Sequence, residues 1–199
     1  MIPILILAAG ASSRMRGRDK LTEEVDGLPL LARQIANAQR LSDDVRVALP
    51  PAPHPRHAIV ADTAALPVPV PDADEGMGAS LRRVFGTLGP DVDKAMLLLG
   101  DLPDLTADDL RAVMGAVRTH PDALIWRGGT QDGRGGHPII FDQTLFSRLL
   151  ALKGDDGGRS VVHAAEDRVH LVPLPGNRAR LDLDTPEDWA AWRAARQAI

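Results

Sequence analysis

Short apolar runs alternate with longer stretches of mixed polarity along most of this chain. The runs are too short for helices and are rich in Val, Ile and Leu, so each predicts a buried β-strand. The longer stretches between most of them have the length and spacing of helices that cover a sheet. This alternation predicts a layered α/β fold. The predicted strands are Ile2–Leu7, Val45–Leu49, Pro67–Val70, Ala95–Leu99, Ala123–Trp126 and Val169–Val172.

Helix-start signals and glycine positions refine this pattern. Thr106 is a favourable N-cap, and proline occupies the first turn of two other predicted helices. The Gly-rich segment Arg127–Pro138 predicts a turn into Ile139–Phe141, which is either functional or a plain hairpin with a loose tip. In Arg180–Asp188 polar residues alternate, which predicts a further strand. The predicted helices are Pro29–Arg40, Gly78–Leu88, Ala107–Thr119, Gln143–Leu152, Gly158–Ala165 and Pro186–Ala198.

The composition limits the size and the partners of this fold. The 199 residues suffice for one α/β domain with a full core but not for two comfortable ones, so we predict a single domain over residues 1–199. A net charge of -4 and 3% aromatic residues argue against a nucleic-acid surface. The absence of cysteine excludes a thiolate zinc site, and no apolar run approaches the ~20 residues of a membrane span. We therefore expect a cytoplasmic protein that binds neither nucleic acid nor membrane.

The segment after the first apolar run combines small residues with cations. From Ala8 to Ala11 the side chains are small, so backbone N–H groups are accessible to a ligand. Ser12 and Ser13 add hydroxyl groups, and the cations that follow are Arg14, Arg16, Arg18 and Lys20. This pattern predicts a polyphosphate-binding loop. A solvated basic turn is the alternative, whereas a signal peptide would place its charges before an apolar run of ~7 to 15 residues.

Carboxylates mark two further segments. Asp101 follows an apolar strand, at the end where α/β proteins bind ligands. We predict that it binds Mg²⁺ rather than merely capping a turn, because a bound triphosphate needs Mg²⁺, which takes one or two carboxylates with phosphate oxygens. Asp184, and after it Asp182, would face one side of their predicted strand and act with Asp101 on the metal or on a second substrate. Structural roles are expected for Asp104, Thr185, Glu187 and Asp188, and for Trp189 and Trp192 core packing rather than an interface.

Several short segments, spread in order over nearly the whole chain, form a specific combination although each alone is weak. They are LAAGASSRM at Leu7–Met15 with Lys20, GMGASL at Gly76–Leu81, GDLP at Gly100–Pro103, GGHP at Gly135–Pro138, GDDG at Gly154–Gly157 and DLDTPED at Asp182–Asp188. Together they resemble the MobA-like NTP-transferase family. The AAG of the first segment, in place of AGG, and the GMGASL segment are more similar to molybdenum cofactor cytidylyltransferases than to the guanylyltransferases.

This resemblance implies a single-domain, Rossmann-like three-layer sandwich with a mostly parallel sheet, of the nucleotide-diphospho-sugar transferase type. It implies a Mg²⁺-dependent enzyme that transfers CMP from CTP to a phosphorylated small molecule, molybdopterin, and releases pyrophosphate. Transient contact with a molybdoenzyme or a cofactor-delivery protein is a further implied interaction. The implied roles are catalysis for Arg14 and Lys20, nucleotide binding for Leu7, Ala8, Ala9, Gly10, Ser13 and Ser80, acceptor binding for Gly136, His137 and Asp182, and metal binding for Asp101 and Asp184.

Two departures from the family pattern and several rival functions stay open. Arg16 adds one residue to the first loop, and Leu21–Val25 contains two acids where the family commonly has an apolar segment with proline. His137 is equally consistent with a surface histidine. The rivals are a 4-diphosphocytidyl-2-C-methylerythritol synthase-type cytidylyltransferase, a molybdenum cofactor guanylyltransferase and a non-catalytic nucleotide-binding module. An NAD(P)-dependent oxidoreductase is disfavoured, because the first loop lacks GxGxxG.

Overall fold

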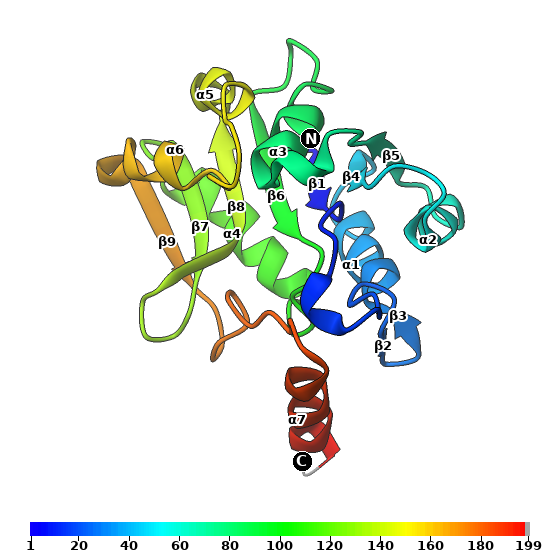
Figure 1. Cartoon of the computed structure of the whole chain (residues 1–199). Coiled ribbons are helices and arrows are strands. Elements are labelled where there is room, and N and C mark those ends of the chain that lie inside the picture. Colours follow the sequence, from blue (N-terminus) through cyan, green and yellow to red (C-terminus); the bar gives the residue numbers. More distant parts are fainter. Residues whose placement is uncertain (198–199) are drawn as a thin grey trace.

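A seven-stranded sheet forms the centre of the computed structural model, which describes residues 1–197 (Figure 1). Its strand order is β5-β4-β1-β6-β8-β7-β9, and among the described strands of this sheet only β8 runs antiparallel to the other six. The predicted α/β fold with a mostly parallel sheet is therefore confirmed. The strands are β1 (Ile4–Leu7), β4 (Val45–Leu49), β5 (Leu66–Pro69), β6 (Lys94–Leu99), β7 (Ile125–Gly129), β8 (Gly135–Asp142) and β9 (Val169–Pro173), and a separate hairpin pairs β2 (Glu24–Val25) with β3 (Leu28–Pro29).

Helices cover both faces of the sheet and complete three layers (Figure 1). One buried apolar cluster joins the sheet to α1, α2, α4 and α7, and a second joins the opposite face to α3, α5 and α6. Burial of these apolar faces supplies the main stabilisation of the fold. The helices are α1 (Leu30–Gln39), α2 (Pro55–Ala61), α3 (Met77–Phe85), α4 (Ala107–Thr119), α5 (Phe146–Leu150), α6 (Arg159–His163) and α7 (Pro186–Gln197).

Two of the predicted elements are wrong. Arg180–Asp188 does not contain a strand, because the backbone N–H groups of Arg180 and Leu181 donate to the carbonyl oxygen of Asn177 and form turns instead of a ladder. The last three residues of this segment, Pro186–Asp188, form the start of α7. Gly135–Pro138 belongs to β8, so the Gly-rich turn ends earlier than predicted. The predicted strand Val45–Leu49 and helix Ala107–Thr119 are present with the predicted ends, and the others are present with shifted ends. Helix α5 is shorter than predicted because Gln143–Leu145 forms a 3₁₀ turn.

Several local features follow the expected chemistry. Thr106 caps α4 in a capping box with Asp109, and Thr185 with Asp188 makes the same contacts at the start of α7. Trp189 is buried and packs edge-on against Trp192, which confirms the predicted core packing.

Ala198, the predicted end of the last helix, lies outside the described residues. Within residues 1–197, no helix has the length and apolar character needed to cross a membrane.

The sheet topology places the first loop and Asp101 at one edge. Leu7, the last residue of β1, is in register with Ala48 of β4 and Leu99 of β6. The chain leaves β1 toward β4 on one side and returns to β6 on the other side. Such a switch of direction leaves a crevice at the carboxyl ends of the strands, where open α/β sheets bind ligands.

Candidate active site

A cleft of about 450 Å³ opens at the carboxyl ends of β1 and β6. It is lined mainly by the loop after β1, the start of α3 with the turn before it, the loop after β6 and Asp184 before α7, and Arg56 of α2 and Asp155 also contribute. Every residue predicted to act in catalysis, nucleotide binding or metal binding lines this first cleft. These are Leu7, Ala8, Ala9, Gly10, Ser13, Arg14, Lys20, Ser80, Asp101 and Asp184.

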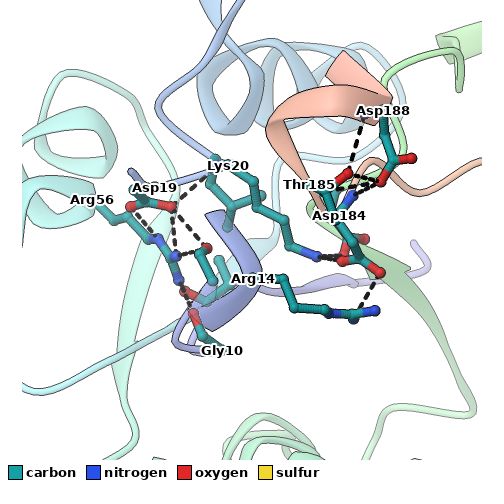
Figure 2. Close-up of polar contacts among 12 residues, drawn as sticks. Gly10, Arg14, Asp19, Lys20, Arg56, Asp184, Thr185 and Asp188 are labelled. Atoms are coloured by element: carbon teal, nitrogen blue, oxygen red, sulfur yellow. Dashed lines mark hydrogen bonds and ion pairs between the residues drawn. The ribbon is translucent and has the colours of Figure 1, made fainter. Parts of the chain in front are cut away.

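A buried arginine holds the loop after β1 in place (Figure 2). Arg56, in the first turn of α2, is 1% exposed and donates to the carbonyl oxygens of Ala8 at 2.7 Å and Gly10 at 2.8 Å. It also donates to the Ser12 hydroxyl at 2.9 Å and twice to Asp19, at 2.8 and 2.6 Å. Burial raises the pKa of Asp19, but the hydrogen bond and the charge of Arg56 outweigh it and the net pKa is lowered. These contacts fix the loop backbone without a ligand.

Lys20 joins two carboxylates in the first cleft (Figure 2). Its Nζ lies 2.5 Å from Asp101 Oδ2 and 2.7 Å from Asp184 Oδ1, and Arg14 lies 2.7 Å from the other oxygen of Asp184. Burial lowers the pKa of Lys20, but the Asp101 and Asp184 carboxylates outweigh it and raise the net pKa. Burial likewise raises the pKa of Asp184, yet Lys20 and then Arg14 lower it overall. The charged forms of Lys20 and Asp184 are therefore favoured at neutral pH.

The carboxylate of Asp101 has one oxygen to spare. Its Oδ1 is buried and has no hydrogen-bond partner among the described residues, which is unusual for a buried carboxylate. Within residues 1–197 no group of three or more His, Cys, Asp or Glu side chains is arranged to hold a metal ion. Mg²⁺ needs only one or two carboxylates when phosphate oxygens and water supply its other ligands. Asp101 and Asp184 therefore fit a cation that arrives with a phosphate, not an all-protein metal site.

Two glycine segments pack against each other beside this cleft. The Gly78 N–H donates to the Gly154 carbonyl oxygen at 2.8 Å, and a Cβ at Gly76 or at Gly78 would lie 2.8 Å from that same oxygen. Only glycine allows such a close approach of the two backbones. The contact positions the buried Ser80 in the wall of the first cleft and brings Asp155 to the border with the next cleft.

A second cleft, of about 570 Å³, adjoins the first, and Asp155 lines both. The three residues predicted to bind an acceptor line the second cleft and not the first: Gly136, His137 and Asp182. The residues predicted for the nucleotide and for the acceptor are thus divided between two adjoining clefts.

Two of the residues predicted to bind the acceptor have perturbed pKa values. Burial, and then the charge of Arg127, lower the pKa of His137 to about 4, so its ring is neutral at pH 7. Its Nδ1 is buried and unpaired among the described residues, so His137 is not a free surface histidine. Burial, and then the charges of Asp184 and Asp101, raise the pKa of Asp182.

The residues that depart from the family pattern, Arg16 and Glu23, form ion pairs outside both clefts. Arg16 has a left-handed φ of 52° and pairs with Glu187 at 2.8 Å on the surface, so the extra residue bulges outward. Glu23 is almost buried and accepts hydrogen bonds from Arg18 and, at 2.7 Å, from Arg193 of α7. It therefore ties the first loop to the last helix.

Comparison with known proteins identifies the family. Residues 4–169 match the model of the MobA-like NTP transferase domain. The chain belongs to the MobA-like NTP transferase family. As a member of this family it is a nucleotidyltransferase. Its sequence is 29% identical over 128 residues to the purine catabolism protein PucB of Bacillus subtilis, a match that spans 62% of this chain and 59% of PucB.

Two other proteins are similar to this chain along nearly their whole length. The probable molybdenum cofactor guanylyltransferase of Synechococcus elongatus is 29% identical over 192 residues, which span 94% of this chain and 95% of that protein. The crystal structure of Rv0371c from Mycobacterium tuberculosis has a TM-score of 0.82 and 29% identity, covering 96% of each chain. A structure of Rv0371c in complex with manganese has a TM-score of 0.78.

Proposed function

We propose that this MobA-like nucleotidyltransferase transfers CMP from CTP to the phosphate of molybdopterin and releases pyrophosphate. The division of the predicted residues between two adjoining clefts is the observation that carries this proposal. In the first cleft, the small-residue loop with Arg14 and Lys20 suits a triphosphate. The second cleft has room for another substrate, whose phosphate would reach the first cleft past Asp155.

The chain would supply placement and charge stabilisation rather than proton transfer. A phosphate nucleophile is already anionic at neutral pH. Its oxygen would attack the α-phosphorus in line, forming one P–O bond while the bond to the β-phosphate bridge breaks and pyrophosphate leaves. Arg14 and Lys20 would stabilise the negative charge on the transferring group. Since Lys20 is held by two carboxylates without a ligand, it would exchange one of them for a phosphate oxygen when nucleotide binds.

Asp101 and Asp184 would hold a Mg²⁺ ion that arrives with the triphosphate. When bound, this ion supplies neutralisation of phosphate charge. The unpaired buried oxygen of Asp101 supports this assignment, as does the manganese in the Rv0371c structure.

The small residues of the first loop support a pyrimidine base. Ala9 lines the first cleft and is 4% exposed, and a methyl group at this position would leave less space for a larger base than glycine would. Ser80, also buried in this wall, would face the base or the ribose. GTP is the second candidate, because a relative similar over nearly its full length is named a probable molybdenum cofactor guanylyltransferase. A molybdoenzyme or a delivery protein would then receive the product.

A nucleotide panel tests the proposal. The protein is incubated with Mg²⁺, each of the four NTPs in turn and molybdopterin, and pyrophosphate release is measured. In the presence of molybdopterin, we expect pyrophosphate release with CTP and not with the other three nucleotides. Release with GTP instead would establish the guanylyltransferase, and release with CTP and 2-C-methylerythritol 4-phosphate would establish the methylerythritol-type enzyme. Nucleotide binding by calorimetry without any pyrophosphate would identify a non-catalytic binding module, and oxidation of NAD(P)H would identify an oxidoreductase.

A further inference from the structure

The second cleft contains three arginines that no sequence motif or predicted role accounts for. Arg127 comes from β7, Arg159 from the start of α6 and Arg180 from the turn before α7. Within residues 1–197 none of them lies within 4 Å of a carboxylate oxygen, although acidic residues also line this cleft. Those acids are Asp155, Asp156, Glu166 and Asp182, of which Asp156 accepts from Ser160 and Glu166 pairs with His163.

The backbone of β8 is shaped to accommodate two of these arginines. Arg127 Nε donates to the Gly136 carbonyl oxygen at 2.9 Å, and Arg180 Nη1 donates to the Gly135 carbonyl oxygen at 2.8 Å. A Cβ at Gly135 would lie 2.9 Å from the guanidinium carbon of Arg127, so Gly135 leaves the space that this side chain fills. A Cβ at Gly136 would overlap the Ala179 carbonyl oxygen and lie 2.8 Å from Arg180 Cγ, so Gly136 admits the backbone that carries Arg180. Each guanidinium uses one nitrogen on the strand and keeps N–H groups for a ligand.

The like charges in this cluster act on one another. Burial, and then the charges of Arg180 and Arg159, lower the pKa of Arg127. Holding cations together in a partly desolvated cleft without a direct ion-pair partner is unfavourable, and acidic residues elsewhere in the cleft offset this only in part. A bound anion would relieve this repulsion, and arginine is the side chain best suited to bidentate contact with phosphate or carboxylate.

We infer that Arg127, Arg159 and Arg180 form an anion subsite that holds a negatively charged group of the acceptor, separate from the phosphate that reacts. This inference rests on the proposed function for the identity of the acceptor. The reacting phosphate must reach the first cleft, where Lys20 and Asp101 lie, whereas the three arginines line only the second. The acceptor class is therefore a small molecule with at least two anionic groups.

Phosphate titration tests this subsite independently of turnover. The first cleft is filled with cytidine 5′-(α,β-methylene)triphosphate, which cannot transfer CMP, and inorganic phosphate is titrated in by calorimetry. Arg127→Gln and Arg180→Gln should each weaken phosphate binding by about tenfold to a hundredfold, the range for hydrogen bonds to charged groups. Arg118→Gln is the matched control, since this exposed residue of α4 lines neither cleft. Circular dichroism checks folding, and the exposed Arg180 makes its variant the safer of the two.

Each outcome decides the inference. No phosphate binding by the wild type, or equal binding by the wild type and both glutamine variants, overturns the subsite. With molybdopterin as substrate, the same variants should raise the acceptor KM by a similar factor and leave the CTP KM unchanged. If the wild type forms no pyrophosphate with any acceptor, the proposed function fails, while the phosphate titration still decides the anion subsite.

Discussion

The cationic side chains of the two clefts have different partners. In the first cleft Arg14, Lys20 and Arg56 each lie in direct ion pairs with aspartates. In the second cleft Arg127 and Arg180 contact carbonyl oxygens of β8 instead. The first cleft is thus organised by internal charge pairs before any ligand binds, and a triphosphate must displace some of them or bring its own cation. The second keeps its donors available for an anion.

The largest expected effect concerns the arginine that holds the first loop. Replacing Arg56 by Met leaves Asp19 and two carbonyl oxygens without their buried partner, so the free energy of unfolding should fall by about 3 to 5 kcal/mol. Urea denaturation measures this loss. Arg83→Met is the control, because its ion pair with Asp72 is exposed and should contribute less than about 1 kcal/mol. Equal losses in the two variants would show that the buried pair does not hold the loop.

Charge stabilisation in the same cleft gives the next effect. Lys20→Ala should lower kcat by about a hundredfold or more, corresponding to about 3 kcal/mol, with the fold intact by circular dichroism. Lys153→Ala is the matched control, since the exposed Lys153 lines neither cleft. Wild-type turnover by the Lys20 variant would remove this residue from the mechanism.

Some residues of the first cleft could be predicted from the sequence, whereas Arg56 could not. The strand-end position of Asp101 and the small residues after β1 are local signals, and topology then brings them together. Arg56 has no such signal, because its partners are backbone carbonyls and an aspartate 37 positions away. Its helix, α2, follows a proline-rich loop and is too short to show a clear period.

The secondary structure of the segment before α7 could not be predicted from the sequence for a different reason. The alternation of Asp182 and Asp184 is the same in a strand and in an extended loop, and only a neighbouring strand distinguishes the two. The segment has turn hydrogen bonds rather than a ladder, yet Asp182 and Asp184 still influence each other's pKa. The two carboxylates are thus near each other although the predicted strand is absent, but they do not share one side as the strand would require, because Asp184 lines the first cleft and Asp182 the second.

In the second cleft, pH should affect stability through His137. Its pKa is lowered from 6.5 to about 4 in the folded chain, so between these values the unfolded chain binds a proton that the folded chain does not. The free energy of unfolding should therefore fall as pH falls, by about 2 kcal/mol from about pH 6 to about pH 4.5 at ~1.36 kcal/mol per pKa unit.

Urea unfolding across this pH range measures the effect, with His137→Gln compared with the wild type. The variant should show a shallower pH dependence of the free energy of unfolding than the wild type. Parallel curves for the wild type and His137→Gln would mean that this ring is not buried in its neutral form.

The smallest effect tests whether the first cleft selects its base by shape. Because Arg56 holds the backbone on both sides of Ala9, this residue would not easily move away from a larger base. Ala9→Gly should raise the ratio of kcat/KM for GTP to that for CTP by about tenfold, as expected for one methyl group in a close-fitting pocket. Ala11→Gly adds the same backbone freedom at an exposed position of the same loop and should leave the ratio unchanged. An equal shift in both variants would mean that loop flexibility, not the Ala9 methyl group, sets the base preference.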